Sequence, residues 1–472
     1  MRFFKDRAYF YNITFKSMID FSYAIFENEV HFCNTYFESV VHFSFTKFKG
    51  VCDFSNTKFL ATQKKEERNR ICFDDTEFED IVHFYSAKFE SKVLFCKSVF
   101  KSKVNFNGAE FSTSHYDDAE INNFDNVTFE SDAWFNDIIF NSSVLFSKCE
   151  YKGNIYMRNI TSKQQLYFYE SLFLSNVYFN NSHFKDYVNF CECEFEKTAC
   201  FYGVKFDKTP NFSQAIFKGN LNVVNTNLNF TFDDLQERIK QEYENFNKDI
   251  KEKENKKPLD KFANDFRDSF RTFKNALIKD NNLLDASNFH KYELYCKEIE
   301  LKNKKGKTFK DVVDRWQLLF YRKLCDHHTN LILNLKWFIV IVGFFTSILF
   351  GLRYGDGNLM QFFNKDSDLL KMLKNILNIK ALNDSNATYL ILLYSFIGLF
   401  FVRTFFIFYY LVIFILMLAI SPYNLFTMIN FAIRHETNSF LENIIIIIYT
   451  LSIVLIIFSL QKTARKNSIV PS

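Results

Sequence analysis

Two groups of side chains have the residue types that ligate a metal ion. They are Cys191, Cys193 and Cys200 in the first half of the chain and Cys325, His327 and His328 in the segment LCDHH. In the Phe repeat described below, Cys193 stands at an inward position two residues before Phe195, whereas Cys191 directly follows Phe190 and faces outward, so the first group should diverge. We expect the second group to be a solvated pair of histidines beside an apolar stretch. The sequence therefore predicts no metal site and no cofactor. It also predicts ten free thiols, because no secretory signal precedes the cysteines.

No pattern of an enzyme active site is present. The chain lacks a Gly-rich phosphate loop, a Ser-His-Asp order and an HExxH motif, so we predict that it is not an enzyme. Arg403 stands alone in a long apolar run, and an intramembrane charge marks a functional site by default. The alternative is an Arg that snorkels to the membrane surface or ends a segment there.

The dominant feature is a repeat centred on Phe. The chain has 63 Phe against 11 Gly and 4 Pro, and from Phe10 the spacing between Phe residues alternates between five and six. This makes 19 units of 11 residues up to Leu228, with Phe at 33 of 38 positions. The first Phe residues of the units form a predicted ladder: Phe10, Phe21, Phe32, Phe43, Phe54, Phe73, Phe84, Phe95, Phe106, Phe124, Phe135, Phe146, Phe168, Phe179, Phe190, Phe201 and Phe212.

A spacing of five and six fits neither an α-helix nor one long strand. It fits a short strand followed by a turn, with a second inward residue two positions before each Phe. Before the first Phe this residue is often Val, as at Val30 and Val41; before the second it is small, as at Thr46, Ala87 and Cys149. The two halves of each unit should therefore lie in different environments.

Segments such as VHFYSAKFES, VLFCKSVFKS and VNFNGAEFST resemble the pentapeptide-repeat family, in its Phe-rich form with one extra residue in every second repeat. The resemblance covers about residues 8–229 and implies a β-solenoid, a right-handed quadrilateral parallel β-helix, over residues 1–229. Two units would form one coil, so 19 units imply nine to ten coils.

Two insertions interrupt the repeat. Residues 60–70 (LATQKKEERNR) add eight residues and residues 112–123 (STSHYDDAEINN) add seven. We expect both to leave the rod as loops, either as tolerated surface insertions or as a surface that binds a protein partner. The net charge of +4 does not favour nucleic acid as a partner.

Residues 230–330 carry three amphipathic helical patterns, near 230–257, 258–277 and 285–304. The first should cap the exposed end of the rod, and the others should form a neck. The segments DASNFHKYELYCKEIELK and WQLLFYRKL are similar to the linker in membrane-anchored members of the pentapeptide-repeat family.

Residues 331–472 contain three apolar stretches: Leu331–Leu352, Tyr389–Ile420 and Ile444–Leu460. They predict transmembrane α-helices, although the second is too long for one simple crossing. Basic residues before the first stretch place the rod in the cytoplasm, and those at the tail require an even number of crossings, so two, three or four remain open. The sequon-like DSNAT around Asn386 suits an external loop. We expect a multi-pass protein of the bacterial inner membrane, in contact with the lipid bilayer.

These features favour a non-catalytic scaffold or protein-interaction platform. The alternative is a channel- or transporter-like membrane protein with a cytoplasmic regulatory rod. Some membrane-anchored relatives end in a pore loop, but this chain has no Thr-x-Gly-Tyr-Gly filter between its apolar stretches.

Overall fold

The computed structural model describes residues 2–60, 70–112, 121–248, 250, 256–354, 411 and 440–465. The chain divides into two compact units, residues 1–315 and 316–472. Arg403, Asn386 and nearly all of the apolar run Tyr389–Ile420 lie outside the described residues.

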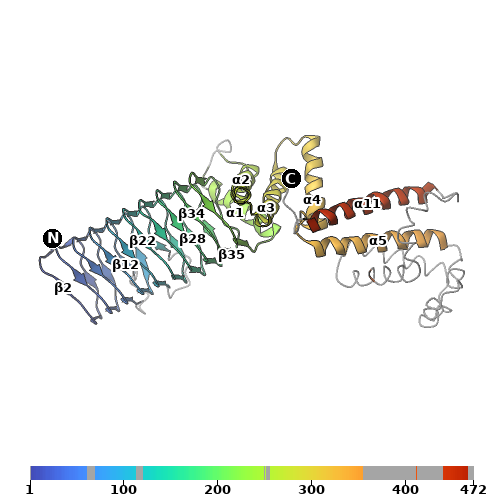
Figure 1. Cartoon of the computed structure of the whole chain (residues 1–472). Helices are drawn as coiled ribbons and strands as arrows, with labels where there is room; N and C mark the ends of the chain where they lie inside the picture. The colour runs from blue at the N-terminus through green and yellow to red at the C-terminus, as the bar shows by residue number, and fades with distance from the viewer. Residues whose placement is uncertain are drawn as a thin grey trace, which may run out of the picture. The chain divides into compact units, whose positions relative to one another are not determined.

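Residues 2–228 of the first unit form a parallel β-solenoid with four sheets of short strands, two or three residues each (Figure 1). Sheet A runs from β1 (Arg2–Phe4) to β36 (Ile216–Phe217), and sheet B from β2 (Ala8–Tyr9) to β37 (Leu221–Asn222). Sheet C runs from β3 (Thr14–Phe15) to β38 (Asn227–Leu228), and sheet D from β4 (Ile19–Asp20) to β32 (Val188–Asn189). Sheets A, B and C have ten strands each and sheet D has eight. About ten coils are therefore present, which confirms the expected solenoid.

Neighbouring coils pair residues 22 positions apart, such as Val30 with Cys52. Across the insertions the offset grows to 30, for Cys52 with Val82, and to 29, for Val104 with Ala133. Both insertions join sheet C to sheet D, the first after β11 (Lys58–Phe59) and the second after β19 (Glu110–Phe111). They therefore begin at the same corner of the rod, with one uninterrupted coil between them.

The second insertion ends earlier than the sequence suggested, because Asn122 and Asn123 form strand β20 of sheet D. Asn122 is fully buried at a position where neighbouring coils have Val93 and Val144. Its Oδ1 accepts a hydrogen bond from the Val93 main-chain N–H at 3.0 Å, and its Nδ2 donates to Ser142 Oγ at 2.8 Å. The Asn side chain thus supplies an acceptor that a main-chain carbonyl provides in other coils, such as Lys103 for Val82.

The Phe rings predicted to form the ladder lie inside the rod and stack on the rings of the next coil. Phe32, Phe54 and Phe84 are parallel, with ring centroids 4.9 and 5.0 Å apart. Rings from opposite sides meet edge to face, as Phe43 and Phe54 do at 5.6 Å and 80°. Among the ladder residues Phe10 alone is half-buried, because it belongs to the first coil, where Phe4 adds a position that the sequence count missed.

The small residue before the second Phe of a unit has a specific role. Where this residue is Thr, Ser or Cys, its hydroxyl or thiol donates to a main-chain carbonyl of the preceding coil, as from Thr57 to Phe32 at 2.7 Å and from Cys149 to Phe124 at 2.9 Å. Ala87, Val127 and Ile138 occupy the same position without a side-chain donor, so only part of the coils have this hydrogen bond.

Each unit also turns one corner through a residue with positive φ, two positions after the first Phe. Asn is common there, as at Asn12, Asn34 and Asn56, with φ of 54–56°. The insertions lie at the other type of corner, which has no left-handed residue among the described coils.

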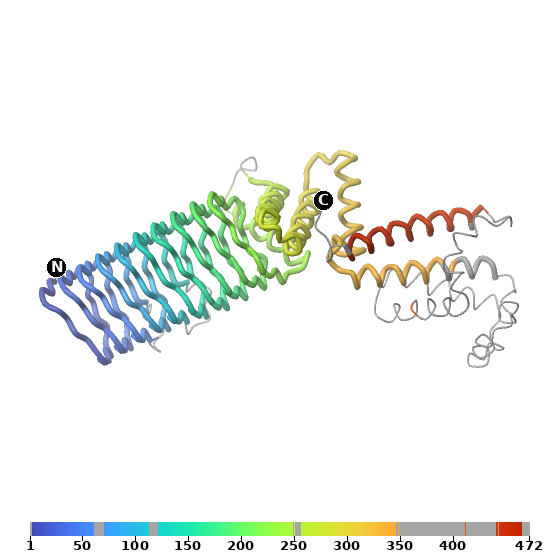
Figure 2. The backbone as a smooth tube through the Cα atoms, viewed as in Figure 1, coloured from blue at the N-terminus to red at the C-terminus, as the bar shows by residue number. Residues whose placement is uncertain are grey.

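Three helices cover the last coils of the rod: α1 (Phe232–Asn247), α2 (Leu259–Lys279) and α3 (Leu283–Asn303) (Figure 2). Thr231 and Asp234 form a capping box that begins α1. Phe273 of α2 packs on Phe212 at 4.8 Å, and the Tyr292 hydroxyl of α3 donates to the Leu228 carbonyl at 2.8 Å. Helices α2 and α3 thus share with α1 the cover of the rod's end, which the sequence assigned to the first helix alone, and the neck stays a prediction.

Helix α4 (Phe309–Cys325) crosses the boundary between the units, and α5 (Leu331–Tyr354) and α11 (Phe440–Arg465) belong to the second. Among the described residues, one helical segment, Asn443–Ala464, is long and apolar enough to cross a membrane, and Leu331–Phe345 is a shorter apolar one. The multi-pass arrangement stays a prediction.

Helices α5 and α11 pack on each other, with Phe345 and Tyr449 in ring contact and the buried Asn334 donating to Ser459 at 2.9 Å.

Candidate functional site

The outer face of sheet B concentrates side chains that can bind or ligate. Residues immediately before the first Phe of a unit point outward, and parallel pairing aligns them along the rod. In sheet B, from the first coil to the tenth, they are Tyr9, His31, Asp53, His83, Asn105, Trp134, Tyr156, Tyr178, Cys200 and Asn222. Sheets A and C instead present ion pairs such as Lys47 with Glu77 and Lys88 with Glu110. Sheet B is therefore the candidate functional face.

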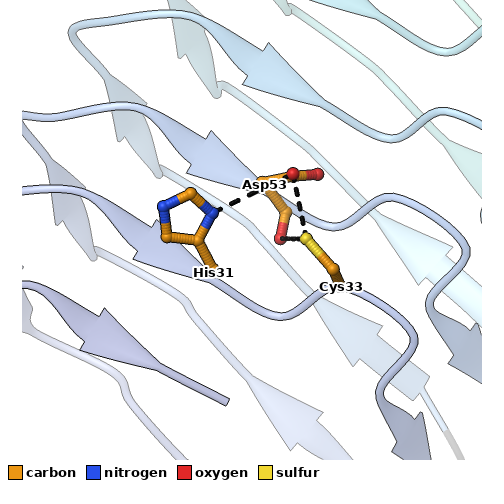
Figure 3. A group of neighbouring side chains, drawn as sticks. All are labelled: His31, Cys33 and Asp53. Carbon is orange, nitrogen blue, oxygen red and sulfur yellow. Dashed lines mark hydrogen bonds and ion pairs between the residues drawn. The ribbon is translucent and has the colours of Figure 1, made fainter. Parts of the chain in front are cut away.

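His31, Cys33 and Asp53 converge at the second and third coils (Figure 3). His31 lies in β6 (Val30–His31), Asp53 lies in β10 (Cys52–Asp53), and Cys33 follows β6 at the corner. Asp53 Oδ2 accepts from the Cys33 thiol at 2.9 Å and lies 3.9 Å from His31 Nδ1. One nitrogen, one sulfur and one oxygen all lie within 4.8 Å of one another, and all three residues are half-buried.

Neighbouring groups hold these side chains in place. Asp53 Oδ1 accepts from the Ser55 main-chain N–H at 2.8 Å, which leaves Oδ2 facing Cys33 and His31. The other nitrogen of His31, Nε2, lies 3.7 Å from Glu29, whose carboxylate in turn pairs with Arg7 at 3.3 Å. The His31 ring also stacks on Tyr9, with centroids 5.4 Å apart.

The protonation states follow from this packing. Burial, together with the hydrogen bond to Asp53, raises the pKa of the Cys33 thiol to about 12. Burial opposes ionisation of Asp53, but hydrogen bonds from Cys33 and Ser55 outweigh it and lower the pKa of that carboxyl. At neutral pH the cluster therefore has a protonated thiol beside a carboxylate, so Cys33 is not an activated nucleophile.

Farther along the face the side chains become aromatic. The rings of Trp134 and Tyr156 stack at 5.7 Å, and those of Tyr156 and Tyr178 at 5.4 Å. The Arg158 guanidinium lies 5.1 and 5.0 Å from the two Tyr rings. Beside Trp134, a surface hollow of about 350 Å³ is lined by residues that include His83 and Lys103. Aromatic residues and Arg are the types enriched in protein interfaces.

The cysteines singled out in the sequence do not form a site. Cys193 is fully buried and donates to the Phe168 carbonyl at 2.9 Å, whereas Cys191 is half-buried on the outside. All ten cysteines are free, as predicted.

The histidines of the segment LCDHH, His327 and His328, are not a solvated pair. Cys325 is fully buried, His327 is 7% exposed, and His328 Nδ1 lies 3.5 Å from Cys325 Sγ and 3.4 Å from Ser459 Oγ. Residues 326–328 all have positive φ, between 50° and 65°. This left-handed turn places His328 against α11, a contact that apolar periodicity does not reveal.

The His31, Cys33 and Asp53 cluster was missed because its members are 20 and 22 positions apart. The signal that could have found it was the coil period itself, which places residue 53 beside residue 31. Comparisons with family models, with curated proteins and with solved structures found no match to the chain.

Proposed function

We propose that the chain is a membrane-anchored member of the pentapeptide-repeat family that acts as a non-catalytic scaffold, a platform for a protein partner. The proposal rests on the regular solenoid, whose core is filled by stacked rings, so that the polar and ligating side chains lie on its outer surface. Such rods offer long, rigid binding surfaces.

The observation that carries the proposal is the shared corner of the two insertions. Both begin between sheets C and D, and two strand layers at about 4.8 Å each separate their starting points. Two insertions that begin at one corner can contact the same partner. The aromatic row of Trp134, Tyr156 and Tyr178 on sheet B is a second surface of suitable composition.

The test is cross-linking and capture of the full-length tagged chain from membranes of its own cells. One variant lacks residues 61–69 and 113–120, and a second combines Trp134→Ala with Arg158→Ala. A control of similar size on sheet C combines His183→Ala with Lys205→Ala. We expect a partner that the control retains and that the deletion loses; loss only in the second variant would move the binding surface to sheet B. Enrichment no greater than with an unrelated solenoid would contradict the scaffold.

Membrane anchoring is supported by the segment Asn443–Ala464. We infer that the protein lies in the bacterial inner membrane with its rod in the cytoplasm. Tags at the C-terminus and near Asn386, probed from each side, test the topology and the number of crossings. Release of the protein by alkaline washing of membranes would contradict the anchor.

The channel- or transporter-like alternative depends on Arg403 and the run Tyr389–Ile420. Ion flux in liposomes that contain the full chain, compared with the Arg403→Gln variant, tests it. Flux that disappears in the variant would favour this alternative over a pure scaffold.

A further inference from the structure

We propose that His31, Cys33 and Asp53 form a binding site for one Zn²⁺-type transition-metal ion on the outer face of sheet B. The site would be present whether or not a partner binds the rod. It combines one imidazole, one thiol and one carboxylate from two adjacent coils. The imidazole and the thiol both face the same carboxylate oxygen, Asp53 Oδ2.

The geometry needs only small adjustments to accept the ion. With ordinary Zn–N, Zn–O and Zn–S bonds, a tetrahedral site places N and O about 3.4 Å apart and S and O about 3.6 Å apart. The distances from Asp53 Oδ2 are 3.9 Å to His31 Nδ1 and 2.9 Å to Cys33 Sγ. The first must shorten by about 0.5 Å and the second lengthen by about 0.7 Å, which side-chain rotation in half-buried residues permits.

The groups around the ligands match those of metal sites. A metal-bound His usually donates its second ring nitrogen to a carboxylate, which fixes the ring and its tautomer. With His31 Nδ1 on the ion, Nε2 faces Glu29, and Arg7 holds that carboxylate. The Ser55 N–H similarly holds Asp53 Oδ1 and leaves Oδ2 for the ion.

The ligand set selects the class of metal. Thiolate and imidazole suit Zn²⁺ and its neighbours, whereas Mg²⁺ and Ca²⁺ require oxygen ligands. When sulfur bonds the ion, the Cys33 thiol releases its proton to solvent. Three protein ligands leave a fourth position open, and the ion would join β6 to β10 across the coil boundary.

The experiment uses the full chain, reduced and stripped of metal with a chelator. Titration with Zn²⁺ should show one tight equivalent per chain, and Co²⁺ should show the charge-transfer absorption of a thiolate ligand. The variants Cys33→Ser and His31→Asn should weaken Zn²⁺ binding at least 100-fold. Glu29→Gln should weaken it about 10- to 100-fold, with the stoichiometry kept.

Cys96→Ser is the matched control. Cys96 is also half-buried, and its main-chain N–H donates to the carboxylate of Asp74 one coil earlier, without a grouped His. Its loss should leave both titrations unchanged. Circular dichroism should show the same fold in every variant, since all substituted side chains lie outside the core. Equal Zn²⁺ affinity in the wild type and Cys33→Ser, a Co²⁺ spectrum without the thiolate band, or binding of Mg²⁺ as tight as Zn²⁺ would overturn the proposal.

Discussion

Tyr151 interrupts a column of Phe rings, and its replacement by Phe should stabilise the rod. Its ring is fully buried and stacks on Phe129 at 5.1 Å and on Phe173 at 4.6 Å. Within the described part of the chain its hydroxyl oxygen makes no hydrogen bond of good geometry, and the polar neighbour is the Cys149 thiol, a weak donor that already donates to the Phe124 carbonyl at 2.9 Å. The substitution Tyr151→Phe keeps the ring in place and removes only this polar group.

The magnitude follows from the cost of burying a hydroxyl without a hydrogen bond, which is about 1–3 kcal/mol in protein mutants. The area of stacked ring does not change, so the free energy of unfolding should rise by about this amount. For a domain of this size, each kcal/mol raises the midpoint of thermal unfolding by about 2–4 °C.

Thermal unfolding of the full chain, followed by circular dichroism, measures this change. The matched control is Phe129→Tyr, which places the same hydroxyl one coil earlier in the same column. It should lower the midpoint by a similar amount. A midpoint for Tyr151→Phe at or below that of the wild type would refute the reasoning, since the buried hydroxyl would then have a compensating partner.

Three further predictions concern other contacts of the rod. Asn122→Val introduces the residue type usual at that position, yet it should lower the free energy of unfolding by about 1–3 kcal/mol, because the Val93 N–H loses its acceptor. Urea unfolding measures this loss of stability, with Val144→Ile as the control. Phe273→Ala should uncover the Phe212 ring and cost about 3–5 kcal/mol, which increased dye binding at exposed apolar surface would reveal, and unchanged stability would show that α2 does not cap the rod. Partial burial raises the pKa of Glu293, but hydrogen bonds from His290, Lys274 and Arg271 outweigh it and hold that pKa well below its usual 4.5. The contribution of Glu293 to the free energy of unfolding is therefore present above about pH 4.5 and is lost as the pH falls. Denaturation at a series of pH values should show a weaker dependence on acid for Glu293→Gln, and an unchanged dependence would contradict the assignment.

The period of the repeat, the inward residues and the lengths of the insertions follow from the sequence alone. Each unit of 11 residues makes its strands and corners from local preferences, so the pattern of Phe predicts the coil without knowledge of distant contacts. The pairing offsets of 22, 30 and 29 agree with the expected insertions of eight and seven residues.

The tertiary structure decided which outward residues meet. Stacking brings Asp53 beside His31 and Cys33, and it makes Asn122 a replacement for a main-chain acceptor. It also places Phe273 of α2, rather than α1 alone, on the last ring of the ladder. These contacts depend on side chains from different coils or helices, whose relative positions arise only when the coils stack and the apolar end is covered. Local periodicity describes a single coil, whereas the cluster of His31, Cys33 and Asp53 needs side chains from two adjacent coils.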